Sequence, residues 1–372
     1  MKPLRSKLMN LLREINLELN YLPYSFRKNI NLNNPKKFLI VAHWLIGDLI
    51  VLTPSIKVIK DQYPQAKIDI IISKGMKDVL SLNPNINKIF EINKKEIEEN
   101  LKWYSEKLKK EKYDVGIIFF EGDKKTSRLL KEADIPIRIG CAKSGVKRGK
   151  GYYLTRKTKP DHKEKQYLFY NLDVLKTINI FPKEIKQEIF VDKKDEEKFR
   201  KIMGNKLKIV VHAVPNHKTH IWNNKRFAEV ADYLIERKKA AVFFTGAKKD
   251  APLNDEIISL MKNKAQNLAG GSIKDFFGII KNSDLVISVD TSAMHVAATF
   301  NIPVIALMGA SPYKLWKPYS NRAVTIFHPE KCTECRLYKC FRKGKRYMEC
   351  MDSITKDEVI QSCDLLLKEN KK

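Results

Sequence analysis

The chain has 372 residues, of which 71 are Lys or Arg and 43 are Asp or Glu, so its formal net charge is +28. This length predicts two domains, and an apolar fraction of 43% argues against a disordered chain. No apolar run reaches the ~18–20 residues that span a bilayer. Six cysteines are too few for a disulfide scaffold. Arg13, Glu14 and Glu18 interrupt the N-terminal apolar stretch, so we expect no secretion signal and a cytoplasmic protein.

The excess of positive charge indicates an acidic partner, which is nucleic acid, anionic lipid or a phosphorylated substrate. The alternative is a compositional bias, because Lys, Ile and Asn are all abundant, as in proteins of AT-rich genomes. The charge is concentrated in residues 1–37, with eight Lys/Arg and two Glu (net +6), and in residues 138–165, with ten Lys/Arg and two acids (net +8). Both segments are candidate surfaces for a negatively charged partner.

Residues 1–37 form a basic N-terminal extension with the pattern of an amphipathic helix. An apolar residue recurs at helical spacing and forms one stripe. Such a helix lies on a membrane surface or packs on the body of the protein, and the pattern leaves both open. The stripe consists of Leu4, Leu8, Leu11, Leu12, Ile15 and Leu19.

From Phe38 onward, short β-branched runs alternate with helical patterns, which predicts parallel sheets covered by helices on both faces. We expect two Rossmann-like domains, residues 38–195 and 196–350, followed by a C-terminal helix in 351–372. The charged stretch 192–206 is the expected connection. The predicted strands are 38–42, 68–72, 89–92, 115–120, 137–139, 208–212, 241–245, 285–289 and 303–308, and the predicted helices are 54–62, 224–237, 250–262, 273–281, 293–300 and 356–369.

The end of the first strand carries a candidate base. Gly47 permits a tight turn or the close approach of a ligand. Asp48 follows at the carboxyl edge of the sheet, where a carboxylate can remove a proton from a substrate hydroxyl. The alternative is a helix cap, a position that Asp favours and that spacing alone makes the better interpretation. No Gly-x-Gly-x-x-Gly follows this strand, so a dinucleotide site is disfavoured.

The strand 285–289 runs into an acid and two hydroxyls, Asp290, Thr291 and Ser292, and then into a helix that carries His295 near its start. This junction directs backbone N–H groups and the positive end of a helix dipole toward the carboxyl edge of the sheet. Open α/β sheets bind phosphorylated ligands at that edge. The junction therefore predicts a nucleotide-sugar or other phosphate site.

Two further loops follow strands of the same predicted sheet. Lys218 and His220 lie in a His-rich loop and can meet a diphosphate, although a solvated basic loop explains them as well. Gly246 follows the next strand and can approach a ribose or base. No Asp-x-Asp pair follows a strand, so a metal-dependent nucleotide-sugar site has no obvious ligands.

A Lys/Arg-rich loop near the C-terminus contains a Cys-x-x-Cys pair and two more cysteines. Such a set can hold zinc, but the gaps are irregular, and a reduced or redox-labile cluster is the alternative. We expect no metal and no other cofactor. The four residues are Cys332, Cys335, Cys340 and Cys350.

Taken in order, several short motifs make the chain resemble glycosyltransferase family 9, the bacterial lipopolysaccharide heptosyltransferases. Each motif is weak alone, but their order and spacing match from Phe38 to about Leu367. The motifs are Gly47-Asp48 with Thr53-Pro54, Tyr63-Pro64, Asn83-Pro84, Tyr113-Asp114, Arg138-Ile139-Gly140, Trp222 with Arg226-Phe227-Ala228-Glu229, Leu268-Ala269-Gly270, Ser288-Val289-Asp290-Thr291 with His295, Pro303 to Gly309, and the cysteine run with Met351 and Ile354-Thr355.

The resemblance implies a GT-B fold, in which two Rossmann-like domains face each other across a cleft. It implies an inverting, metal-independent transfer of heptose from an ADP-activated donor to a lipid-linked lipopolysaccharide inner-core or lipid A acceptor. Asp48 would be the catalytic base, with Gly47 and Thr53 on the acceptor side. Lys218, His220, Gly246 and the 290–295 junction would hold the donor. The family's phosphate-binding Lys lies two residues before the Trp, where this chain has His220.

We expect the protein to act peripherally at the inner face of the cytoplasmic membrane, with an anionic membrane surface as a partner. Two alternatives concern the same sites, namely a family member that uses another nucleotide sugar and a non-catalytic homologue that binds a nucleotide or glycan. Nucleic acid is not an expected partner, because no recognised nucleic-acid module or stacking-aromatic motif accompanies the charge.

Overall fold

The computed structural model describes residues 32–119, 124–141, 153–159 and 165–369, together with residues 12, 15 and 19. The chain divides into two compact units, residues 1–188 and 189–372. Among the described residues, no helix has both the length and the apolar character needed to cross a bilayer. Most of the predicted N-terminal helix lies outside the described residues.

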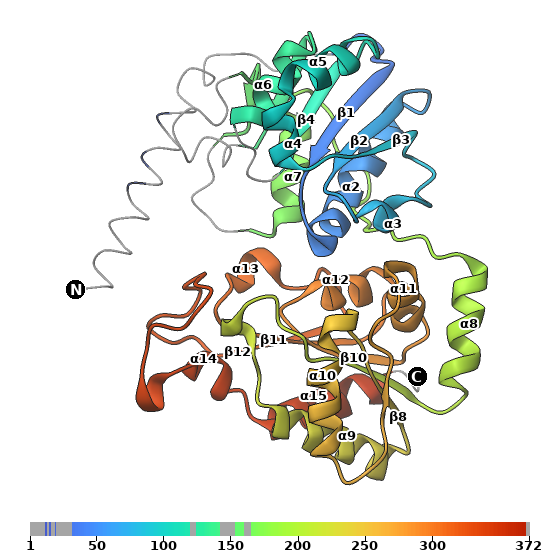
Figure 1. Cartoon of the computed structure of the whole chain (residues 1–372), viewed down its shortest axis with the longest axis vertical. Helices are drawn as coiled ribbons and strands as arrows, with labels where there is room; N and C mark the ends of the chain where they lie inside the picture. The colour runs from blue at the N-terminus through green and yellow to red at the C-terminus, as the bar shows by residue number, and fades with distance from the viewer. Residues whose placement is uncertain are drawn as a thin grey trace. The chain divides into compact units, whose positions relative to one another are not determined.

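The first unit is built on a six-stranded parallel sheet (Figure 1). Its central strands are almost wholly buried runs of Ile, Val and Leu, as expected of a sheet covered on both faces. The spatial order is β3-β2-β1-β4-β5-β6, so the chain reverses its direction of travel between β1 and β4. The strands are β1 Lys37–Ala42, β2 Lys67–Ile72, β3 Lys88–Glu91, β4 Val115–Ile118, β5 Ile137–Gly140 and β6 Arg156–Lys157.

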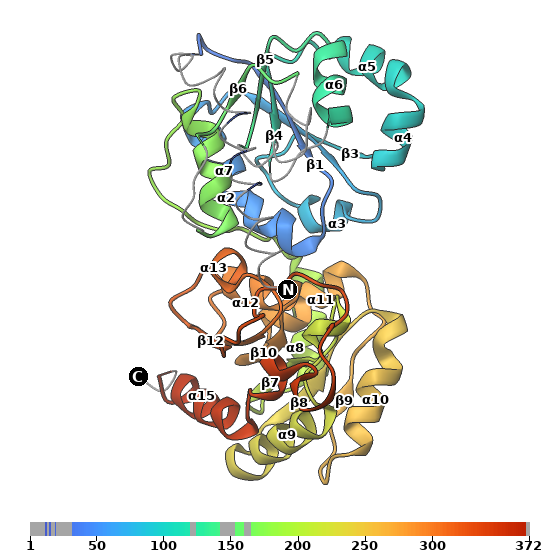
Figure 2. The ribbon, with the colours of Figure 1, turned by 90° about the vertical axis from the view of Figure 1, so that its left-hand side faces the viewer.

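Helices cover both faces of this sheet (Figure 2). One face carries α2 (Ile46–Gln62) packed against α7 (Tyr167–Lys176). The other carries α4 (Lys94–Glu99), α5 (Leu101–Lys109) and α6 (Lys124–Glu132), which bury a core with side chains of β1, β2 and β4. A short helix, α3 (Lys77–Leu80), follows β2.

The second unit repeats the same plan. Its parallel sheet has the order β12-β11-β10-β7-β8-β9, with the reversal between β7 and β10. Both units therefore have the strand order of a Rossmann fold. The strands are β7 Lys208–His212, β8 Ala241–Phe244, β9 Gln266–Asn267, β10 Leu285–Val289, β11 Val304–Met308 and β12 Ala323–Phe327.

Alternate residues of the second sheet face two different helix layers. One set forms a core cluster with α9 (Asn224–Lys238), α10 (Ala251–Ser259) and α15 (Lys356–Glu369). The helices α8 (Lys193–Met203), α11 (Ile273–Lys281) and α12 (Ser292–Thr299) pack side by side as a second group. Short helices α13 (Tyr313–Trp316) and α14 (Glu349–Asp352) and the 3₁₀ turns η2 (Lys218–His220), η3 (Lys248–Asp250) and η4 (Gly344–Arg346) lie in the loops.

The structure confirms the nine predicted strands and adds three that the sequence pattern did not indicate, namely β6, β9 and β12. The predicted connection 192–206 is wrong, because most of it forms α8. Asp192 caps this helix by accepting the Lys194 N–H at 2.9 Å, and only Phe199 and Met203 of the helix are buried. The stretch is charged because only one narrow side of α8 is packed, against α11, and the other sides face solvent. The boundary between the two units lies earlier, after Glu188.

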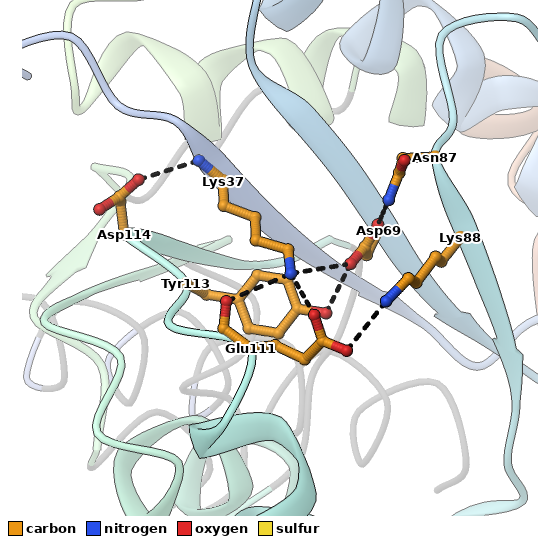
Figure 3. A network of polar contacts seen from close by, with 7 residues as sticks. All are labelled: Lys37, Asp69, Asn87, Lys88, Glu111, Tyr113 and Asp114. Atoms are coloured by element: carbon orange, nitrogen blue, oxygen red, sulfur yellow. Dashed lines mark hydrogen bonds and ion pairs between the residues drawn. The ribbon is translucent and has the colours of Figure 1, made fainter.

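A polar network lies at the amino ends of the central strands in the first unit (Figure 3). Asp69 of β2 is fully buried, and its carboxylate accepts hydrogen bonds from the Tyr113 hydroxyl and the Asn87 amide, both at 2.7 Å. The Lys37 ammonium lies 3.8 Å from Asp69 and also pairs with Glu111. Burial, with the neighbouring Asp69 carboxylate, raises the pKa of Tyr113, so the phenol stays protonated and donates.

The same network fixes the chain on either side of β1. The Asp114 carboxylate accepts the backbone N–H groups of Lys36 and Lys37 at 2.7 and 2.9 Å, and Lys88 pairs with Glu111 at 2.9 Å. The Tyr113-Asp114 motif is therefore structural. It joins β1, β2 and β4 at the edge opposite to the one where β1 runs into Asp48.

We predict that Tyr113→Phe lowers the free energy of unfolding by about 1–3 kcal/mol, because it leaves an oxygen of a buried carboxylate without its donor. Urea denaturation followed by circular dichroism measures the change. Tyr63→Phe is the matched control, since the Tyr63 hydroxyl only accepts a 3.4 Å contact from exposed Gln62. Equal midpoints for both variants would show that the phenol contributes nothing.

Candidate functional site

The carboxyl edge of the first sheet presents Asp48 at the point where the chain reverses between β1 and β4. β1 ends at Ala42 and α2 begins at Ile46, so Asp48 lies in the first turn of the helix, half-buried. Its Oδ2 accepts the Leu45 N–H at 3.1 Å. The carboxylate therefore caps the helix, and it also lies at the edge where ligands of open α/β sheets bind. Gly47 precedes it in the same turn.

Thr53 has a structural role, which differs from the acceptor-side position that the sequence suggested. It is 1% exposed, and its hydroxyl donates to the Ile50 carbonyl at 2.7 Å and accepts the Glu188 N–H at 2.9 Å. Pro54 has no N–H for the Ile50 carbonyl, four residues earlier in the helix. The Thr53 hydroxyl supplies the missing donor, which explains how Pro54 is kept inside α2.

The carboxyl edge of the second sheet carries the predicted strand-to-helix junction. β10 ends at Val289, Asp290 follows, and α12 starts at Ser292 with Thr291 as its N-cap residue. The Thr291 hydroxyl lies 3.1 Å from the buried Ser288 hydroxyl. No side chain caps the first N–H groups of α12, so they remain suitable for an anionic ligand.

His220 from the loop after β7 joins this junction. Its Nε2 lies 3.1 Å from the Ser311 hydroxyl and 3.9 Å from Asp290 Oδ2, and the residue is 7% exposed. Burial lowers the pKa of His220, and the nearby Asp290 carboxylate partly opposes that effect. His220, Asp290 and Ser311 thus bring together three loops that follow β7, β10 and β11.

Two more buried histidines lie in the second unit. His212 ends β7 beside Ser288 of β10, and His295 lies in α12 with its ring centroid 6.3 Å from that of Trp316. Burial lowers the pKa of each to about 4, so both are neutral at neutral pH. The Nδ1 atoms of these two residues and of His220 are buried without a hydrogen-bond partner. Unsatisfied buried nitrogens are uncommon and mark positions where a ligand can supply the partner.

Lys218 is not brought into this group. It is exposed at the start of η2 and makes no hydrogen bond or ion pair with another described residue. The next residue, Thr219, donates its hydroxyl to the Leu337 carbonyl at 2.7 Å and so fixes the turn. The structure thus distinguishes the two candidate phosphate ligands, with His220 buried beside Asp290 and Lys218 facing solvent.

Two glycines at the carboxyl edge of the second sheet are closely packed. A Cβ on Gly246 would lie 3.0 Å from side-chain atoms of both Val214 and Asp250. A Cβ on Gly309 would lie 2.7 Å from Met351 Sδ and 3.0 Å from Cys350 Sγ. The motif that ends in Gly309 therefore packs against the Cys350-Met351 end of the cysteine motif.

The four C-terminal cysteines are free thiols. Burial raises the pKa of Cys350 to about 11 and also raises that of Cys332, so both are protonated at neutral pH. Within the described ranges, which include all four, no group of three or more His, Cys, Asp or Glu side chains is arranged to hold a metal ion.

Sequence reasoning missed several residues of the second edge. Ser311 lies three residues after β11 and was detectable as a hydroxyl that follows a predicted strand. His212 and Ser288 lie inside buried strands, and the apolar sequence pattern of those strands does not indicate a ligand-binding residue. Trp316 contacts His295 only through the tertiary fold. Trp222 and Phe227 of the family motif are core residues, each 1% exposed, with ring centroids 4.6 Å apart.

The comparisons with known proteins agree with this arrangement. Lipopolysaccharide heptosyltransferase 3 of Escherichia coli K12 is 26% identical over 341 residues, which cover 87% of this chain and 96% of that protein. A glycosyl transferase family 9 structure from Veillonella parvula superposes with a TM-score of 0.76 at 20% identity, covering 91% of this chain and all of the other. The E. coli ADP-heptose lipopolysaccharide heptosyltransferase II gives a TM-score of 0.73 at 22% identity, with coverages of 91% and 100%.

The structural likeness shows a GT-B fold, which the two Rossmann-like units also predict. A sequence model of the family described as glycosyltransferase family 9 (heptosyltransferase) matches residues 103–346, which is more than half of the chain. The chain belongs to glycosyltransferase family 9.

Proposed function

We propose that this glycosyltransferase transfers heptose from an ADP-activated donor to a lipopolysaccharide inner-core or lipid A acceptor, with inversion at the anomeric carbon. The main observation behind this proposal is that each Rossmann-like unit has a polar strand-to-helix junction at the point where its strand order reverses. The junction in the first unit bears a carboxylate, and the junction in the second bears uncapped helix N–H groups. This distribution suits a base on the acceptor side and an anion-binding site on the donor side.

In the proposed reaction, Asp48 removes the proton from the acceptor hydroxyl as its oxygen attacks the anomeric carbon. The bond from that carbon to the diphosphate oxygen breaks, and ADP leaves with the bonding electrons. A carboxylate that attracts the proton in this way typically accelerates the step by ~10²–10⁴-fold. Gly47 adds no side chain beside the carboxylate, which favours the approach of a bulky sugar acceptor.

On the donor side, we propose that the start of α12 binds the diphosphate, with Thr291 and Ser292 adding hydroxyl donors. The positive end of a helix dipole stabilises such an anion. Asp290 would accept hydrogen bonds from hydroxyls of the donor sugar. His220 and His295 would complete the site, and Lys218 would reach a phosphate from the solvent side. No step in this scheme uses a metal ion.

The alternative of a non-catalytic homologue concerns the same residues, because Asp48 has a structural task as a helix cap. The two roles are separable by chemistry. An Asn side chain still offers a carbonyl oxygen to the Leu45 N–H, whereas it has no basicity.

Asp48→Asn should lower turnover by ~10²–10⁴-fold while ADP affinity and thermal stability stay close to wild type. Release of ADP from the ADP-sugar in the presence of acceptor measures turnover. Asp61→Asn is the matched control, since Asp61 lies on the last turn of the same helix and pairs with Lys57 at 2.9 Å. Full turnover by the Asp48→Asn protein would reject the base and favour the non-catalytic homologue.

Substitutions in the η2 turn should identify the phosphate ligand. If Lys218 makes a charge-assisted phosphate contact, Lys218→Ala weakens ADP binding by ~1–3 kcal/mol in calorimetry. Loss with His220→Ala but not with Lys218→Ala would transfer that role to His220. Exposed Lys225 at the start of α9 provides a control, Lys225→Ala, outside the turn. A chelator should leave ADP binding and turnover unchanged, and loss of either would contradict a metal-independent site.

We further propose that the basic N-terminal extension associates with the inner face of the cytoplasmic membrane, where a lipid-linked acceptor is presented. The described residues of its apolar stripe, Leu12, Ile15 and Leu19, are helical and 51%, 47% and 64% exposed, so this part of the stripe is not buried by the protein. Its net charge of +6 adds attraction to anionic lipid, about 1 kcal/mol per basic residue and screened by salt.

Removing residues 1–35 should therefore weaken sedimentation with anionic vesicles at low salt, because both the apolar stripe and most of its charge are lost. Association should be reversible by salt, since no residue of the extension is expected to insert across the bilayer. Equal vesicle binding by the full-length and shortened proteins would reject the extension as an anchor.

A further inference from the structure

A second surface with mixed basic and apolar character lies in the C-terminal unit, on the 331–347 segment between β12 and α14 (Figure 1, red loop). The segment has seven Lys or Arg and one Glu, so its net charge is +6. Four large apolar or aromatic side chains are interleaved with these charges. They are Leu337, Tyr338, Phe341 and Tyr347, which are 41%, 57%, 42% and 52% exposed.

Exposed apolar side chains are unusually concentrated in the 331–347 segment. Apart from the N-terminal stripe with Leu12, Ile15 and Leu19, exposed large apolar side chains elsewhere in the described chain are scattered over many elements, as is normal for a folded protein. Here four of them occur within eleven residues, alternating with Lys and Arg. Exposing clustered apolar side chains to water is unfavourable, and such clusters usually mark an interaction surface.

The backbone of the segment is held in place, so these side chains are presented from a fixed base. The Arg336 N–H donates to the Ala310 carbonyl at 3.0 Å, and the Leu337 carbonyl accepts the Thr219 hydroxyl at 2.7 Å. At its far end, Arg342 pairs with Glu349 at 3.0 Å. The segment is thereby joined to the loops after β7 and β11, which also carry His220 and Ser311 of the candidate donor site.

Most of the charge in the segment is uncompensated. Lys339, Lys343, Lys345 and Arg346 are exposed, and none of them pairs with a carboxylate of the described residues. Their ammonium and guanidinium groups are therefore available to a negatively charged partner. A single-stranded nucleic acid would use these charges and would stack bases on Tyr338 or Tyr347, but it would gain little from Leu337.

We infer that the 331–347 segment docks on an anionic lipid bilayer. Its exposed Leu and aromatic side chains enter the headgroup region, where Tyr is favoured, and its basic side chains contact lipid phosphates. The interaction is interfacial, because the segment has no apolar run long enough to cross the bilayer. It is independent of the sugar that the enzyme transfers and of the N-terminal extension, and it places lipid beside the loops of the donor site.

Sedimentation of the full-length protein with vesicles tests this inference. The vesicles contain phosphatidylcholine with or without phosphatidylglycerol. One variant replaces apolar groups, L337S/Y338S/Y347S, and another replaces charges, K343Q/K345Q/R346Q. A matched control, L260S/K262Q/K264Q, removes exposed groups of the same kinds from the end of α10 and the loop after it. The N-terminal extension is present in all four proteins, so its contribution is constant.

Both segment variants should bind phosphatidylglycerol vesicles at least about tenfold more weakly than wild type, and the control should bind normally. ADP affinity and the urea midpoint should be unchanged in all variants, which separates loss of docking from loss of folding. Wild-type vesicle binding by the apolar variant would overturn the inference. A single-stranded RNA oligonucleotide is the second probe, and loss of RNA binding in the charge variant, with intact vesicle binding in the apolar variant, would instead assign the segment to a polyanion.

Discussion

The reversal of strand order in each sheet is the constraint on which the candidate site depends. When a parallel sheet grows in both directions from its first strand, the connections leave in opposite senses and the loops separate above the carboxyl edge. That separation lies between β1 and β4 in the first unit and between β7 and β10 in the second. Asp48 follows β1, and Asp290 follows β10. The chain thus uses the same topological opening twice, once with a carboxylate in a helical turn and once with an uncapped helix start.

The two edges of the first sheet have different tasks. The amino edge holds the network around Asp69, in which buried charge is satisfied by Tyr113, Asn87 and Lys37. Breaking a buried pair is costly, whereas a satisfied network makes the local arrangement of strands specific. At the carboxyl edge, Asp48 is oriented by the start of α2, where it accepts the Leu45 N–H. A rigid amino edge therefore fixes the register of β1, and the position of Asp48 follows from that register.

Much of this architecture was predictable because the strands are buried on both faces and read as continuous β-branched runs. The predicted limits of α11, 273–281, are also correct, and Ser272 and Asp275 form a capping box at its start. Short strands such as β9 have only two residues and carry no period to detect. The start of α2 was missed because Pro54 normally ends or begins a helix, and the compensating hydroxyl of Thr53 is visible only in the folded chain. Helix α8 was taken for a connection because only one narrow side of it packs.

The sequence identified which loops carry the candidate site more reliably than it identified what each residue in those loops does. Asp48, His220 and Asp290 follow β1, β7 and β10 and lie at the carboxyl edges of their sheets, since the ends of parallel strands determine that edge. Roles depend on burial, which the sequence does not give. Lys218 and His220 are two residues apart, yet one faces solvent and the other lies 3.9 Å from Asp290. Gly246 was interpreted as a ligand position, but it also packs closely against Val214 and Asp250.

The buried histidines bear on how the proposed donor site would hold an anion. His212 and His295 are neutral near pH 7, so they add hydrogen bonds but no charge to the second edge. Asp290 brings a negative charge to the same place. The attraction for a diphosphate must then come from the start of α12 and from an exposed cation at the rim, such as Lys218. An exposed cation also acts at long range and raises the rate of encounter with an anion. Directional groups inside the edge, which are mostly neutral, are left to set the specificity.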